Sequence, residues 1–214
     1  YHLLISKWTK SAAAGRKWAA DVLEPYILDK VDAIIQLNKT FVRITDEIYP
    51  EKNYSKKTVV IPNGVDLARV ILKTKPKSSQ INLLYLGRLD RSKGMYELCI
   101  AFGELYKNYT NLKLHILGGG YARQYVAGEQ PKKPIADFEA STMKRLLRRA
   151  KVPEDSFVFY GVKFDQEKED IINNCDLIVM PSYAEYFTMV GLEALAHKKP
   201  LIASTAAGLK ETFI

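Results

Sequence analysis

The sequence predicts an α/β fold in which helices cover both faces of a parallel β-sheet, preceded by part of a second α/β domain. The chain has 214 residues, which is enough for one core or for one core and part of a second. Of these residues 47% are hydrophobic and 26% charged, values typical of a folded globular protein. From about residue 80, short continuous apolar runs alternate with segments of helical periodicity. Strands that are apolar on both sides are typical of parallel sheets covered by helices.

The elements of this main domain follow one another in strict alternation. We expect strands at 81–87, 112–120, 156–161, 176–182 and 200–205, and helices at 94–109, 137–151, 166–175, 188–197 and 207–214. This order predicts a Rossmann-like sheet, in which ligands bind beyond the carboxyl ends of the strands. The loops that leave those ends read GRLDRSKG, GGGYA, GVKFDQE and PSYAEYF. A functional site is therefore expected among these loops.

The beginning of the chain has a different pattern. A long helix is expected over 9–30, a strand over 32–37 and a second helix over 39–49, before a turn at the sequence PNG. We therefore expect residues 1–61 to be the remnant of an amino-terminal domain and residues 62–214 to be the main domain, incomplete at its end. The loop 121–136 is long, and loops of that length are usually functional or mobile.

Composition excludes several classes of protein. No apolar run approaches the roughly 18 residues that span a bilayer, and the first residues lack the features of a signal peptide. The two cysteines, Cys99 and Cys175, are too few for a disulfide framework or a metal cluster. They indicate a reducing compartment, so we expect a cytoplasmic protein.

The net charge of +8 suits an anionic partner such as a nucleotide, a phospholipid headgroup or a nucleic acid. The charge is dispersed, and the basic stretches 73–77 and 144–151 are most simply solvated faces. The second stretch contains Leu146 and Leu147, which leaves open a weak peripheral attraction to an anionic membrane surface. No basic stripe is interleaved with aromatic residues, so nucleic acid is not the expected partner.

The loop GRLDRSKG carries two cations that suit a diphosphate. Arg88 offers a planar fork for phosphate oxygens and Lys93 a mobile point charge. The plainer alternative, that both residues are solvated surface cations, explains this loop equally well.

The glycines of GGGY (118–121) form no dinucleotide fingerprint, and a plain tight turn explains them at least as well. His115, inside a strand, is expected to be a packed sheet histidine rather than a catalyst.

The segment PSYAEYFTMVGLEAL combines a helix start with two carboxylates. Thr188 is a credible N-cap, which would leave the amides of Met189, Val190 and Gly191 available to an anion. Carboxylates such as Glu185 and Glu193 accept hydrogen bonds from hydroxyl-rich groups. The plainer alternative is a helix-dipole carboxylate and a surface glutamate. Phosphate-binding and sugar-binding groups at one sheet edge together describe a site for a nucleotide sugar.

The ordered motifs resemble those of retaining glycosyltransferases of family 4, which have the GT-B fold. The motifs VIPNGVD, YLGRLDRSKG, LHILGGG, VFYGVKFDQE, DLIVMPSYAEYFTMVGLEALAHKKPLIAS and AAGLKE occur in the family's order, with an E-x7-E spacing from Glu185 to Glu193. The resemblance implies that residues 1–61 end an acceptor-side domain and residues 62–214 bind the donor. Thr188 and Lys198 stand where the family keeps glycine. At Thr188 the Cβ would narrow the sugar's approach, or the hydroxyl would add a hydrogen bond.

The resemblance also implies roles. Arg88 and Lys93 would bind the donor diphosphate, Glu185 would contact the transferred sugar, and these three would be catalytic. Glu193 would hold the ribose. The full donor-binding set would be Gly87, Arg88, Lys93, Val162, Lys163, Glu185, Phe187, Thr188, Met189, Val190 and Glu193.

The implied reaction moves a hexose from a nucleotide-diphosphate sugar, such as a UDP- or GDP-hexose, to an acceptor hydroxyl with retention. It needs no metal or cofactor, and its acceptor is a glycan, a lipid-linked glycan or a small molecule. The alternatives are a degenerate nucleotide-sugar-binding module without activity, and another GT-B enzyme such as a sugar-nucleotide epimerase.

Overall fold

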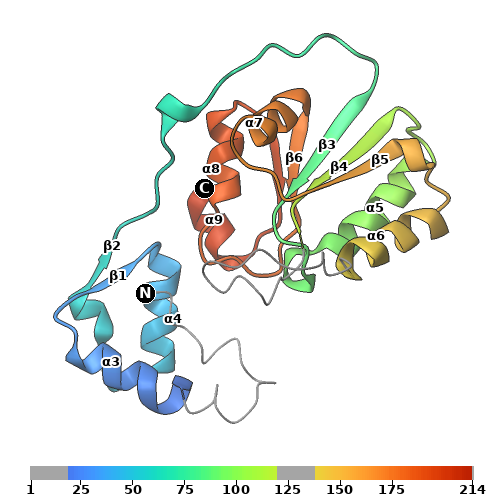
Figure 1. Ribbon diagram of the computed structural model, residues 1–214. Coiled ribbons are helices and arrows are strands. Elements are labelled where there is room, and N and C mark those ends of the chain that lie inside the picture. Colours follow the sequence, from blue (N-terminus) through green and yellow to red (C-terminus); the bar gives the residue numbers. More distant parts are fainter. Residues whose placement is uncertain (1–18, 120–137, 214) are drawn as a thin grey trace, which may run out of the picture. The chain divides into compact units, whose positions relative to one another are not determined.

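The computed structural model describes residues 19–119 and 138–213, which form two compact units. The second unit runs from Gly64 to Ala206, and the first unit ends at Asn63 and takes up the helix that follows Ala206 (Figure 1). The expected loop 121–136 and the expected helical residues 9–18 lie outside the described residues.

The second unit is built on a five-stranded parallel sheet with the order β5-β4-β3-β6-β7. Its strands are β3 (Ile81–Leu86), β4 (Leu112–Leu117), β5 (Phe157–Gly161), β6 (Leu177–Met180) and β7 (Leu201–Ala203). All five strands occur where the sequence predicts them, so the Rossmann-like fold is confirmed. The chain order reverses beside β3, because β4 and β5 lie on one side of it and β6 and β7 on the other. Such a reversal opens a crevice at the carboxyl ends of the neighbouring strands.

Helices cover both faces of this sheet, with α5 and α6 on one face and α7 and α8 on the other (Figure 1). Their bounds are α5 (Met95–Tyr106), α6 (Phe138–Arg149), α7 (Asp165–Asn174) and α8 (Met189–Ala196), with 3-10 turns η3 (Leu67–Arg69), η4 (Arg91–Lys93) and η5 (Glu154–Ser156). In α6, Leu147 is fully buried and Leu146 packs against the core. These two leucines therefore face the protein interior rather than a membrane surface.

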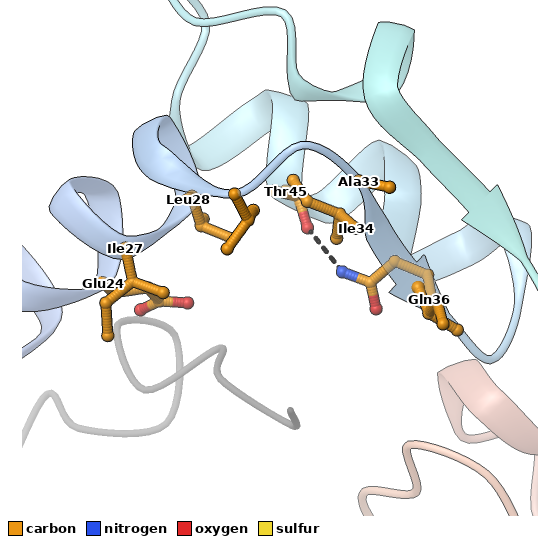
Figure 2. A pocket seen from close by; sticks show the side chains of 9 residues that line it. Glu24, Ile27, Leu28, Ala33, Ile34, Gln36 and Thr45 are labelled. Atoms are coloured by element: carbon orange, nitrogen blue, oxygen red, sulfur yellow. Dashed lines mark hydrogen bonds between the residues drawn. The ribbon is translucent and has the colours of Figure 1, made fainter.

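The first unit pairs two short parallel strands, with Ile34 opposite Thr58. Its described elements are η1 (Ala19–Leu23), α3 (Glu24–Lys30), β1 (Ile34–Gln36), α4 (Lys39–Ile48), η2 (Tyr54–Lys57), β2 (Thr58–Val60) and α9 (Ala207–Phe213). This unit contains a hollow of about 230 Å³, at which the Gln36 amide donates to the Thr45 hydroxyl over 3.2 Å. Figure 2 shows side chains that line this hollow, with that hydrogen bond as a dashed line. None of the predicted site residues lines this hollow.

The sequence predicts that α9 belongs to the main domain, whereas its contacts group it with the first unit. The Glu211 carboxylate accepts hydrogen bonds from the Lys39 and Thr40 amides, both at 2.7 Å, and from the Thr40 hydroxyl at 2.8 Å. These amides are the open donors at the start of α4. A carboxylate there satisfies them and complements the positive end of the helix, which holds α9 in the first unit.

Both cysteines are buried free thiols of the second unit. Burial raises the pKa of Cys99 and of Cys175 to about 12, so neither thiol is a ready nucleophile. None of the helices in the described ranges is both long enough and apolar enough to cross a membrane.

Candidate functional site

Two glycines bring the strand-end loops into backbone contact. Gly94 has φ +65°, and a Cβ there would lie 1.9 Å from the Pro181 carbonyl oxygen. The Tyr183 amide also donates to the Ser92 carbonyl at 2.8 Å. The loop after β3 therefore lies directly on the loop after β6, which are the two loops beside the crevice of the sheet.

The glycine run after β4 has a packing role. Gly118 has φ +144°, and a Cβ there would lie 1.8 Å from the Gly87 carbonyl oxygen. The Gly118 amide donates to the Gly161 carbonyl at 2.9 Å, which links the ends of β4 and β5. In the described part of the run, the glycines thus allow one backbone to approach another.

A hollow of about 250 Å³ opens where the loops after β3 and β6 meet, and it contains most of the predicted donor-binding residues. Its lining consists of Tyr85, Leu86, Gly87, Arg88, Lys93, Met180, Ser182, Glu185, Phe187, Thr188, Met189 and Val190. Of the predicted set, only Val162, Lys163 and Glu193 are not part of this lining. Val162 is 51% exposed, and its Cγ2 would lie 2.9 Å from a Cβ on Gly119.

Lys93 and Glu185 form an ion pair at the hollow, with Nζ 2.6 Å from Oε1. Their side chains are only 16% and 12% exposed. The Ser182 hydroxyl donates to the same Oε1 at 3.1 Å. Within the described ranges no donor reaches Oε2 of Glu185, so one oxygen of this carboxylate is fixed and the other is available to a hydroxyl group.

Arg88 lies at the rim of the hollow, half exposed, with its guanidinium 3.4 Å from Asp90 Oδ2. Its backbone carbonyl accepts a hydrogen bond from the Tyr85 hydroxyl. Burial, followed by the charges of Asp90 and Glu185, raises the pKa of Tyr85, which therefore stays a donor. The Asp90 side chain in turn accepts from the Ser92 amide at 2.9 Å, which shapes the turn leading to Lys93.

Thr188 is the N-cap of α8, as predicted. Its hydroxyl accepts a hydrogen bond from the Gly191 amide at 2.9 Å and lies 3.7 Å from Met180 Sδ. Thr188 as a whole is 2% exposed. The prediction of three available amides is wrong in one respect, because this cap occupies the amide of Gly191. The amides of Met189 and Val190 have no partner within the described residues, and they begin the helix at the hollow.

His115 is a packed sheet histidine, as predicted. Its Nδ1 lies 2.8 Å from the Tyr160 hydroxyl and its Nε2 lies 3.0 Å from Asn82 Oδ1. Burial, followed by the charges of Lys113 and Lys75, lowers the pKa of His115 to about 4. The ring is therefore neutral near pH 7, and it does not line the hollow.

Three residues with contacts at or near the site, Ser182, Tyr85 and Lys168, were not predicted from the sequence. Ser182 stands three positions before Glu185 in the same strand-end loop, so the sequence already placed the two residues close together. Tyr85 and Lys168 carry no such signal, because their partners are set by tertiary contacts. Among the residues that the structure describes, no cluster of His, Cys, Asp and Glu is suited to hold a metal ion.

Most of the chain matches a known protein family. Residues 70–214 match the family described as Glycosyl transferases group 1. Glycogen synthase of Mycobacterium tuberculosis is 30% identical over 156 residues, which are 72% of this chain and 33% of that protein. Lipopolysaccharide 1,2-N-acetylglucosaminetransferase of Salmonella typhimurium is 28% identical over 202 residues, covering 89% of this chain and 49% of that protein. The chain thus spans between a third and a half of the length of these relatives.

Solved structures share the fold. Sucrose-phosphate synthase from Thermosynechococcus elongatus matches 100% of this chain and 51% of its own, with 25% identity and a TM-score of 0.70. HepE of Anabaena, solved in complex with UDP and glucose, matches 86% of this chain and 47% of its own, with 19% identity and a TM-score of 0.62. These similarities show a Rossmann-like α/β fold of the GT-B type.

Proposed function

Because the chain belongs to the group 1 glycosyltransferases, we propose that it is the donor-binding part of an enzyme that moves a hexose from a nucleotide-diphosphate sugar to an acceptor hydroxyl. One observation carries this proposal. The hollow beside β3 and β6 combines the cations Arg88 and Lys93, the carboxylate of Glu185 and the start of α8. A phosphate group and a sugar in one ligand match this combination.

The donor diphosphate occupies the cationic side of the hollow in this proposal. Arg88 and Lys93 contact its oxygens, and the amides of Met189 and Val190 add two fixed donors at the positive end of α8. The same groups stabilise the charge that develops on the leaving diphosphate. Since these cations supply that stabilisation, we expect transfer to persist in the presence of a chelator such as EDTA.

In this proposal the transferred sugar lies beside the Glu185 carboxylate and the nucleoside beside the Glu193 carboxylate. Oε2 of Glu185 accepts from a hydroxyl of the transferred sugar, and Phe187 and Gly87 complete that part of the hollow. Glu193 accepts from the ribose, and the base lies against Val162 and Lys163. Glu185 is already bonded through Oε1, so its orientation is set before the donor arrives.

The stereochemical part of the proposal is transfer with retention, as in family 4. The donor phosphate, held by Arg88 and Lys93, takes the proton of the acceptor hydroxyl on the face where the new bond forms. The acceptor is a glycan, a lipid-linked glycan or a small molecule, and the enzyme works in the cytoplasm or at a membrane surface. Product analysis by NMR gives the anomeric configuration, and an inverted product would contradict retention.

A second candidate is a binding module that holds a nucleotide sugar without transferring it. Thr188 favours this candidate, because its Cβ lies at the helix start that lines the hollow. Nucleotide sugars screened against the full-length protein, with and without EDTA, separate the two. Turnover of one donor is expected. Donor binding without hydrolysis or transfer would favour the binding module, and no binding of any donor would contradict both.

A further inference from the structure

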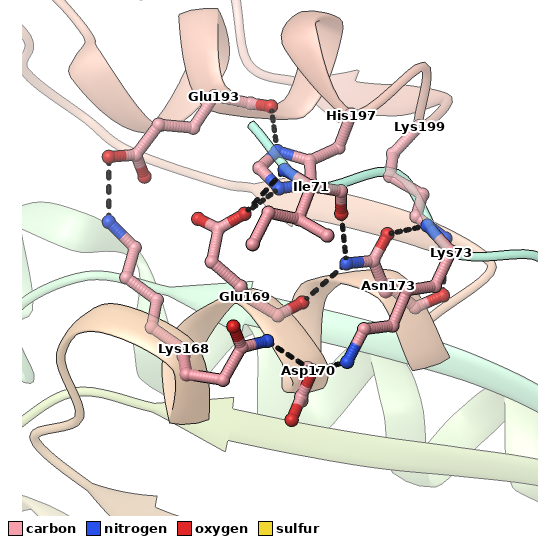
Figure 3. A network of polar contacts seen from close by, with 10 residues as sticks. Ile71, Lys73, Lys168, Glu169, Asp170, Asn173, Glu193, His197 and Lys199 are labelled. Carbon is pink, nitrogen blue, oxygen red and sulfur yellow. Dashed lines mark hydrogen bonds and ion pairs between the residues drawn. The ribbon is translucent and has the colours of Figure 1, made fainter. Parts of the chain in front are cut away.

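A lysine outside the predicted site contacts the second carboxylate of the E-x7-E pair. Lys168 of α7 donates from Nζ to Glu193 Oε1 of α8 at 2.6 Å (Figure 3). The two side chains are 25% and 22% exposed, so water only partly screens the pair. Within the described residues no donor reaches Oε2 of Glu193.

This contact repeats the arrangement at the other end of the motif. Glu185 has Oε1 held by Lys93 at 2.6 Å, and Glu193 has Oε1 held by Lys168 at the same distance. In both pairs one carboxylate oxygen is fixed and the other is left as an acceptor. A carboxylate held in this way loses less side-chain entropy when a hydroxyl group binds.

A polar network beside the pair holds α7 against α8. His197 is 4% exposed, with Nδ1 2.8 Å from the Glu193 carbonyl and Nε2 2.7 Å from Glu169 Oε2 (Figure 3). The Lys199 ammonium donates to the carbonyls of Asn173 and Cys175, each at 2.7 Å, at the end of α7. Since Glu169 is the neighbour of Lys168, this network fixes where the Lys168 side chain begins.

We propose that Lys168 is a positioning residue that orients Glu193 toward the ribose, so that it sets the preference of this site for ribose over deoxyribose. This inference rests on the proposed function, which assigns the ribose to Glu193. Ribose offers two hydroxyl donors to the available oxygen of Glu193, whereas 2′-deoxyribose offers one fewer. The Lys168 charge also neutralises Glu193, which reduces its repulsion of an anionic diphosphate.

The test compares ribose and deoxyribose forms of one nucleotide. Calorimetry measures the Kd of UDP, GDP and ADP, and then of the 2′-deoxy form of the nucleotide that binds, for wild type, Lys168→Met and Lys168→Arg. Wild type should prefer the ribose form by about tenfold, as expected for one hydrogen bond to a charged group. Lys168→Met should bring the two Kd values close together, and Lys168→Arg should restore most of the preference.

Two controls separate positioning from general structural damage. Lys73→Met removes a lysine that pairs with Asp170, a residue of α7 like Lys168, across 2.5 Å. This variant should keep the wild-type preference for the ribose form. In a Glu193→Gln background, Lys168→Met should have little further effect, because the oriented carboxylate is already gone. If Lys168→Met does not fold, Lys168→Gln takes its place in the same comparison.

The outcomes distinguish this inference from the function on which it rests. An unchanged ribose preference in Lys168→Met, or an equal loss of affinity for both nucleotide forms, would overturn the positioning role while leaving nucleotide binding intact. A wild-type protein that binds none of the three diphosphates would overturn the proposed function first, and the role of Lys168 with it.

Discussion

At the scale of single residues, an ion pair between Lys93 and Glu185 sets the orientation of two charged side chains in the hollow. Lys93 and Glu185 are the two groups proposed for the diphosphate and the sugar, yet they neutralise each other across 2.6 Å. Two isolated charges at 16% and 12% exposure would each lose hydration, and the pair compensates for that loss. A bound nucleotide sugar would give Lys93 a contact with the negatively charged diphosphate and Glu185 a contact with a sugar hydroxyl.

Removing the lysine of this pair should destabilise the fold. Lys93→Met leaves the Glu185 carboxylate poorly hydrated, so we expect a loss of about 2 kcal/mol in the free energy of unfolding, somewhat less than for a fully buried pair. Urea unfolding measures this. The control is Lys107→Met, because the Lys107–Glu104 pair is 59% and 66% exposed and should change stability by no more than about 0.5 kcal/mol. Equal effects of the two variants would contradict the role of burial.

His115 should make stability depend on pH in a defined window. Its pKa is about 4 in the folded protein against a usual 6.5, so between these values the unfolded chain binds a proton that the folded chain does not. Stability should therefore fall as pH decreases from 6.5 to 4, by up to about 1.4 kcal/mol per pH unit. In His115→Gln this decline should be smaller. Urea unfolding at pH 7, 6 and 5 gives the free energy of unfolding of both proteins. If this free energy falls equally with pH in wild type and His115→Gln, His115 is not the source of the decline.

At the scale of elements, helix ends and loop contacts decide the geometry of the hollow. Helix α8 starts with a threonine cap and ends with His197 as its C-cap, and the next residue, Lys198, has φ +55°. The Lys199 amide returns to the Ala194 carbonyl at 2.9 Å, which closes the helix end. Glycine normally occupies such a left-handed position, and in this chain Lys198 occupies it.

Lys198→Gly should stabilise the protein. An exposed lysine with a Cβ is strained at this φ, and glycine relieves that strain at a gain of about 1 kcal/mol. Thermal unfolding measures the gain as a rise in Tm. Lys198→Ala is the matched control, because it removes the same charge but keeps the Cβ and should not raise Tm. A similar rise in both variants would assign the effect to charge instead of backbone conformation.

The sequence predicted those features that depend on local residue type and order. The five strands follow from apolar runs, and the N-cap follows from Thr188 standing before an apolar helix. The pairing of Lys168 with Glu193 could not be predicted, because Lys168 lies in a highly charged helix where several partners were available. Its partner depends on how α7 packs on α8, which is a tertiary property. The first-unit position of α9 was missed for the same reason.

At the scale of the whole molecule, the chain combines a unit built on the five-stranded sheet with a smaller unit that includes both early and late residues. Within the smaller unit, Glu211 joins the late residues to the early ones, because its carboxylate accepts hydrogen bonds from the first amides of α4. Hydrogen bonds from Lys39 and Thr40 outweigh burial and lower the pKa of Glu211, so this contact is present at neutral pH.

Glu211→Ala should loosen the first unit without affecting the second. Loss of the cap should cost about 1 kcal/mol and speed amide hydrogen exchange in α4, while the strands β3–β7 and nucleotide affinity stay as in wild type. Lys210→Ala on the same helix is the control and should leave exchange in α4 unchanged. Faster exchange in the sheet instead of α4 would show that α9 supports the second unit.

Binding of a nucleoside diphosphate tests the central claim most directly. Calorimetric titration with UDP, GDP and ADP should show that the protein binds at least one of them. Arg88→Ala should weaken that binding by about 1.5–3 kcal/mol, the value of a hydrogen bond to a charged group. Arg91→Ala, in the same loop but over the Tyr96 ring at 5.9 Å and absent from the hollow's lining, should bind as wild type does. No binding of any diphosphate, or equal affinity in wild type and Arg88→Ala, would contradict the proposed donor site.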